Sequence, residues 1–126
     1  MGIEAVEKEL REKGFNVEEA RTKYGRTELC VRFVEENFEK GYREIRNLLK
    51  NKKDLCIKSY FYSNTVSIMN KADYEYVQRH NQIQAELVEK FWQAKHMGKG
   101  TDDAVAEQRA YAEEHGYMED FNLIYQ

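Results

Sequence analysis

Apolar side chains recur first at helical spacing and then at every second position, which predicts a helix followed by a hairpin. Ile3, Val6 and Leu10 define a helix over about residues 3–13. Period-two alternation then continues on both sides of a glycine-containing turn at 24–26. The chain is therefore expected to begin with one helix and two antiparallel strands.

The same order of helix and hairpin is repeated further along the chain. Helical spacing over about 38–51, which Asn37 can cap, precedes β-branched and aromatic runs at 55–62 and 65–69. Gly41 falls within the apolar arc of this helix, where a missing side chain allows close approach to a sheet. The two hairpins predict one mostly antiparallel four-stranded sheet with helices packed on one face.

The longest predicted helix covers about residues 71–97, and its two apolar rows spread over roughly 200° of its circumference. The rows contain Tyr74, Val77, Ala85, Val88 and Trp92, and Tyr76, Ile83, Leu87, Phe91 and Ala94. So wide an apolar arc requires two neighbours. The first is expected to be the sheet, and the second is either the last helix or another copy of the chain. The candidate interface residues are Tyr74, Leu87, Phe91 and Trp92.

Two glycines end the long helix, and one further helix and a docked tail are predicted after them. Gly98 and Gly100 precede two aspartates, which favour a helix N-terminus and predict a helix over about 101–115. The tail 117–126 holds six large apolar residues, which favours docking on the core. The elements thus follow the order α-ββ-α-ββ-α-α, an α+β fold of two layers.

Composition places the chain among packed globular domains. Its 126 residues are 41% apolar and 34% charged, so we expect a single domain over 1–126. The net charge of −3 favours no class of partner. No apolar stretch approaches the roughly 18 residues that span a bilayer, and residues 1–7 lack the basic-then-apolar order of a signal peptide. We therefore expect no membrane partner and a cytoplasmic location.

No constellation typical of catalysis or cofactor binding is present. His80, His96 and His115 are not spaced as metal ligands, and no serine stands in a nucleophile elbow. Gly98–Thr101 departs from the phosphate-loop pattern because a glycine follows its lysine. The acidic residues between 102 and 120 are interpreted as a solvated face. We expect no catalytic residue, no metal, no cofactor and no enzymatic activity.

Three side chains keep alternative roles open. His80 lies in the apolar arc of the long helix, where a structural role is favoured over that of a general base. Cys30 and Cys56 each fall within a predicted strand, where a free thiol acts as a small hydrophobic side chain. A disulfide bridge or a redox role is the alternative for these two cysteines.

A basic segment between residues 40 and 58 is the clearest chemical signal, since seven basic and two acidic side chains give it a charge of +5. The candidate nucleic-acid contacts are Lys40, Arg43, Arg46, Lys50, Lys52 and Lys53. Cations bind phosphates, and the aromatic run 60–62 offers ring faces for unpaired bases. The alternative is a solvated basic face, or one that meets the acidic helix of the same or another molecule.

Ala85–Lys95 and Gly98–Thr101 lie at the end of the long helix and just beyond it. Through these residues the second half of the chain resembles small uncharacterised accessory proteins carried by mobile elements of Gram-positive gut bacteria. The resemblance contains no chemical motif, so no catalytic residue carries over. It implies an accessory or regulatory role.

The first functional hypothesis is a non-enzymatic protein-interaction or regulatory accessory domain. Its partner is another protein or a second copy of the chain, as a homodimer formed through the long helix, because aromatic residues dominate the energetics of interfaces. The alternative is a nucleic-acid-binding protein that uses the basic helix 40–53.

Overall fold

Four antiparallel strands form one sheet in the order β1-β2-β4-β3. The computed structural model describes residues 2–126, with strands β1 (Val17–Arg21), β2 (Thr27–Arg32), β3 (Leu55–Tyr60) and β4 (Thr65–Asn70). The two hairpins pair through β2 and β4, so β1 and β3 form the edges of the sheet. The predicted α+β fold with a four-stranded antiparallel sheet is confirmed.

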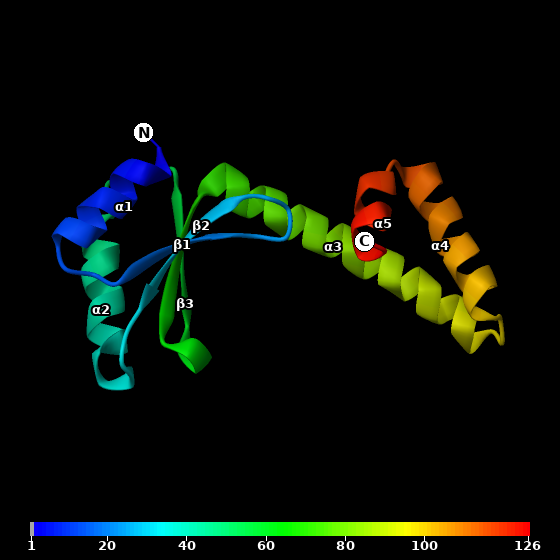
Figure 1. The fold of residues 1–126 in the computed structure, drawn as a ribbon, viewed down its shortest axis with the longest axis horizontal. Coiled ribbons are helices and arrows are strands. Elements are labelled where there is room, and N and C mark those ends of the chain that lie inside the picture. Colours follow the sequence, from blue (N-terminus) through cyan, green and yellow to red (C-terminus); the bar gives the residue numbers. More distant parts are fainter. Residues whose placement is uncertain (1) are drawn as a thin grey trace. The chain divides into compact units, whose positions relative to one another are not determined.

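The helices α1 (Ile3–Glu12) and α2 (Glu35–Leu48) cover one face of this sheet (Figure 1). Side chains of a strand alternate between its two faces, so every second strand residue meets the helices. The core between them consists of Ile3, Val6, Leu10, Val17, Leu29, Val31, Phe38, Ile45, Leu49, Val66 and Ile68.

Helix α2 begins earlier than the sequence pattern predicts. Val34 is its N-terminal cap residue, and Asn37 lies inside the first turn. The prediction that Asn37 caps this helix is therefore wrong. Glu35 and Glu36 occupy the first turn, where the helix dipole stabilises carboxylates without any side-chain cap.

At Gly41, where the sequence predicts close approach of the helix to a sheet, the neighbour of α2 is the ring of Phe33, the residue that follows β2. A Cβ atom at this position would lie 2.2 Å from a ring carbon of Phe33. The Phe33 ring also packs against Phe15 and Phe38, with centroid distances of 6.0 Å and 6.4 Å. Because its neighbours hold the ring in place, packing requires a glycine here.

The aromatic run after β3 leaves the sheet sooner than predicted. Phe61–Ser63 form one 3-10 turn, η1, and Asn64 then adopts the left-handed conformation with a φ of 51°. Asparagine tolerates that region better than most residues, so the turn can return the chain to β4. As a result Phe61 and Tyr62 are 76% and 105% exposed.

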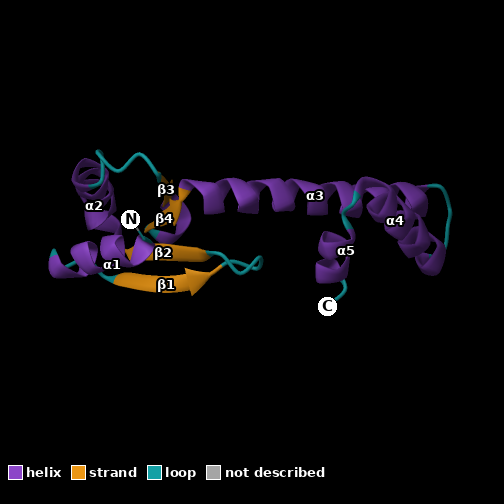
Figure 2. Cartoon of the chain, turned by 90° about the horizontal axis from the view of Figure 1, so that it is seen from above, coloured by secondary structure: helices purple, strands orange, loops and turns teal. Residues whose placement is uncertain are grey.

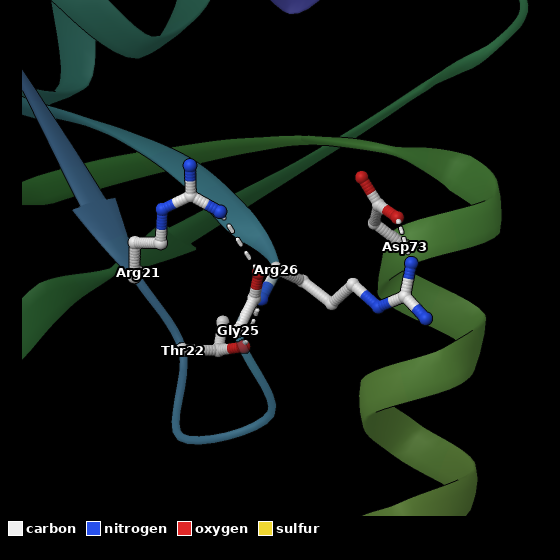
Figure 3. A network of polar contacts seen from close by, with 5 residues as sticks. All are labelled: Arg21, Thr22, Gly25, Arg26 and Asp73. Carbon is white, nitrogen blue, oxygen red and sulfur yellow. Dashed lines mark hydrogen bonds and ion pairs between the residues drawn. The ribbon is translucent and has the colours of Figure 1, made fainter.

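The turn between β1 and β2 forms an ion pair with the first turn of α3 (Lys71–His96) (Figure 3). Both turns lie within residues 1–77, which form one compact unit of the chain. The Arg26 backbone N–H donates to the Thr22 hydroxyl at 3.1 Å, and Arg21 donates to the Gly25 carbonyl at 3.0 Å. The Arg26 guanidinium reaches the Asp73 carboxylate at 3.5 Å. The turn is therefore ordered by polar contacts both within itself and with α3.

The chain divides into two compact units, and the boundary falls inside α3, between Val77 and Gln78. The regular elements of the second unit are all helices: the rest of α3, α4 (Thr101–His115) and α5 (Met118–Ile124) (Figure 2). The predicted docking of the tail takes place through α5, a helix that the sequence pattern did not predict. The expectation of a single domain over 1–126 stays a prediction.

Candidate interaction surface on α3

One side of α3 is occupied by the other helices of the second unit. Ile83 and Leu87 are buried against Ala112 of α4 and Phe121 of α5. Ala94, which follows in the same apolar row, is also buried. The last helices of the same chain therefore cover this apolar row, and another copy of the chain is not needed to cover it.

Leu87 is consequently a core residue and leaves the candidate interface. Its side chain is 0% exposed, so no partner can reach it in the folded chain. Helical periodicity shows which residues share a face, but it does not show which faces the chain itself covers. The Leu87 carbonyl also accepts a hydrogen bond of 2.7 Å from the buried side chain of Gln108, whose Oε1 accepts one from the Tyr125 hydroxyl.

The histidine of the apolar arc joins α3 to α5. His80 Nδ1 lies 2.8 Å and 2.9 Å from the two carboxylate oxygens of Asp120. The side chain of Asp120 is only 3% exposed and that of His80 15%. A buried carboxylate requires such a partner, and the pair therefore fits the structural role expected for His80.

An apolar strip on another side of α3 has no cover within the described residues 2–126. Val88 is 42% exposed and Trp92 53%, and Ala85 is exposed one turn before Val88. Residues spaced by three and four positions share one side of a helix, so these three side chains form a continuous patch. We call Ala85, Val88 and Trp92 the α3 strip.

The sequence pattern placed all three residues in one apolar row, but only Trp92 was named as an interface candidate. Ala85 and Val88 were missed, although their spacing from Trp92 was the signal that could have found them. The rows alone do not distinguish the covered side of α3 from the exposed one.

The two remaining interface candidates have different surroundings. Phe91 is half-buried, and its ring meets that of Trp92 edge to face at a centroid distance of 5.2 Å. Tyr74 is half-buried in the first unit, where the Lys58 ammonium lies 5.2 Å from its ring centroid. A hydrogen bond with Tyr74 raises the pKa of Lys58 above its ordinary value. The Phe91 ring therefore packs against the exposed Trp92 of the α3 strip. Tyr74 belongs to the first unit and is not part of this strip.

The candidate nucleic-acid contacts lie on the surface of the first unit, but carboxylates accompany several of them. The ion pairs are Lys40–Glu44 at 3.9 Å, Arg43–Glu39 at 4.0 Å and Lys52–Glu9 at 3.8 Å. The Arg46 guanidinium lies 5.6 Å from the ring centroid of Tyr42, and Lys50 and Lys53 are exposed. Glu44 is already included in the charge of +5 for residues 40–58, whereas Glu39 and Glu9 lie outside that segment. These two carboxylates therefore make the positive charge offered to phosphates smaller than +5.

Both cysteines are free, and one of them lies in a setting that suppresses thiolate formation. Cys30 is half-buried on the face of the sheet opposite α1 and α2, in register with Ser67 of β4. Burial, together with the nearby charge of Glu28, raises the pKa of the Cys30 thiol to about 11. Glu28 is held close by because its carboxylate accepts a hydrogen bond from the Ser67 hydroxyl.

We expect Cys30 to react slowly with iodoacetamide in the folded protein. With a pKa of about 11 instead of 9.0, its thiolate fraction at pH 8 is about a hundredfold lower than that of an unperturbed thiol. Peptide mass spectrometry would follow the labelling of Cys30, whose rate should still rise with pH above 9. Glu28→Gln should raise the rate, and a rate that levels off near pH 9 would contradict the assignment.

No group of three or more His, Cys, Asp and Glu side chains in residues 2–126 is arranged to hold a metal ion. Among the helices of this same range, none combines the length and the apolar character needed to cross a membrane. No protein-family model, curated protein or solved structure matches the chain.

Proposed function

We propose that the chain is a non-enzymatic protein-interaction module that associates with a second copy of itself through the α3 strip. The observation that carries this proposal is the half-exposed Trp92, with Val88 one turn away on the same side of the helix. Tryptophan is the residue type most enriched among the energetic centres of interfaces, and a surface Trp beside further apolar residues is costly to leave in water.

The sizes of the side chains along the strip favour self-association. Ala85 and Trp92 are two helical turns apart, about 10 Å along the axis. In an antiparallel pair of α3 helices with a two-fold axis near Val88, each Trp92 lies against the small Ala85 of the second copy. A large residue opposite a small one is the complementarity that a two-fold interface requires.

Size-exclusion chromatography with light scattering tests this proposal at low and high micromolar concentration. The wild type should show twice the mass of one chain at the higher concentration and should dissociate on dilution. Val88→Glu should remain at the mass of one chain throughout, because a buried unpaired carboxylate opposes association.

Asn47→Glu serves as the matched control, because Asn47 is an exposed residue of helix α2 in the first unit and lies outside the strip. It introduces the same charge and should leave the dimer intact. A wild type that keeps the mass of a single chain at every concentration would rule out the self-association proposal.

A further inference from the structure

The edge strand β3 presents backbone hydrogen-bonding groups that no other strand uses. The Lys71 N–H donates to the Asp54 carbonyl at 2.6 Å, which makes residues 54 and 71 a hydrogen-bonded pair next to β3 and β4. Such pairs alternate along an antiparallel ladder, so the backbone groups of Ile57 and Ser59 point away from β4. Within residues 2–126 β4 is the one strand paired with β3, and these groups are therefore open to a further strand.

The two edges of the sheet differ in their protection against strand addition. On β1, the exposed side chains of Glu19 and Arg21 place charge along the free edge. On β3 the one charged residue, Lys58, belongs to the face opposite the core, where it lies over Tyr74. Charged side chains are a common means of blocking an edge, so β3 is the less protected of the two.

A groove of about 680 Å³ lies between α2 and the end of β3. Phe38 and Tyr42 of α2 and Phe61 of η1 give it an aromatic lining, and Ser59 lines it from the strand. Phe61 is 76% exposed although its ring packs 6.2 Å from that of Phe38. Because Ser59 belongs both to the groove and to the open edge, a strand added to β3 would direct alternate side chains toward the groove.

Charge at the rim of the groove restricts what can occupy it. Glu35, Glu39 and Arg43 are its charged residues, with a net charge of −1. Arg43 lies 4.0 Å from Glu39, whereas Glu35 has no ion pair among the described residues. The aromatic side chains therefore lie beside a surplus carboxylate, which favours a cationic occupant and disfavours the phosphates of a nucleic acid.

We infer that β3 and this groove bind an extended segment of another protein as an additional strand. The open backbone groups select an extended chain, the aromatic lining selects an aromatic or aliphatic side chain, and Glu35 selects a nearby lysine or arginine. This surface belongs to the first unit and is independent of the α3 strip. It adds a second class of partner to the proposed self-association.

The probe is a fluorescein-labelled peptide of about seven residues that alternates valine and threonine, with one phenylalanine and a lysine two positions later. Fluorescence anisotropy should show micromolar binding. Two further peptides carry N-methyl groups on one or the other alternate set of residues. N-methyl groups on the residues whose N–H groups face β3 should weaken binding at least about tenfold, and N-methyl groups on the other residues should weaken it much less. Equal affinity of the two methylated peptides would overturn strand addition.

Three variants connect the binding to the groove. Phe61→Ala should weaken binding about tenfold, and Tyr62→Ala should not, since Tyr62 is fully exposed and does not line the groove. Glu35→Gln should weaken binding of the lysine peptide but not of its glutamine counterpart. Equal affinity of wild type and Phe61→Ala, or competition by an oligonucleotide, would overturn the inference. Retained binding by Val88→Glu separates this site from the α3 strip.

Discussion

Replacing Leu87 with alanine is expected to lower the free energy of unfolding by about 2–5 kcal/mol, the range found for fully buried leucines. Leu87 is 0% exposed between α3, α4 and α5, so its truncation leaves a cavity that the neighbouring helices can only partly fill. Urea denaturation followed by circular dichroism, at a concentration below that of association, measures this loss.

Val88→Ala is the matched control for this substitution, because Val88 is the next residue and is 42% exposed. Its effect on the unfolding of the single chain should stay below about 1 kcal/mol. The pair separates the buried side of α3 from the α3 strip. Equal losses of unfolding free energy for Leu87→Ala and Val88→Ala would contradict the assignment of Leu87 to the buried side of α3 and of Val88 to its exposed side.

Gly41→Ala is expected to destabilise the first unit even though alanine favours helices. The added methyl group would lie 2.2 Å from the Phe33 ring, and overpacking of this kind costs about 1–3 kcal/mol. The higher helix propensity of alanine offsets at most about 1 kcal/mol of this loss of stability. Thermal unfolding followed by circular dichroism should therefore show a lower Tm.

Asn47→Ala in the same helix is the control for Gly41→Ala, since Asn47 is exposed and the change there should be neutral or slightly stabilising. If Gly41→Ala instead raised the Tm as Asn47→Ala does, Phe33 would have to move freely. The close contact would then not be a requirement of the packing.

Apart from α5, the helices and strands could be predicted because they follow from local periodicity. Period-two alternation identified the hairpins, and helical spacing with terminal glycines placed α3 and α4 close to their observed bounds. The start of α2 was missed because its two glutamates are stabilised by the helix dipole and need no capping side chain. The helical form of the tail was missed because α5 is too short for periodicity to define and depends on packing against α4.

The candidate surfaces were only partly predictable, because they depend on which apolar residues the chain leaves uncovered. The pattern identified two apolar rows on the long helix, yet it treated the buried Leu87 and the exposed Trp92 alike. It also named the aromatic run after β3 but placed it beside lysines. In the folded chain Phe61 shares its groove with Glu35 and Glu39, a proximity that only the packing of α2 against the sheet creates.

The most direct test of the α3 strip uses Trp92, the single tryptophan of the chain, as its own reporter. Its fluorescence emission maximum should be recorded across a dilution series that spans the change in mass observed by light scattering. We expect a shift to shorter wavelength as the concentration rises, because the half-exposed indole loses water when a second copy covers it. An emission maximum that stays constant while the mass doubles would show that association takes place elsewhere and would contradict the proposal.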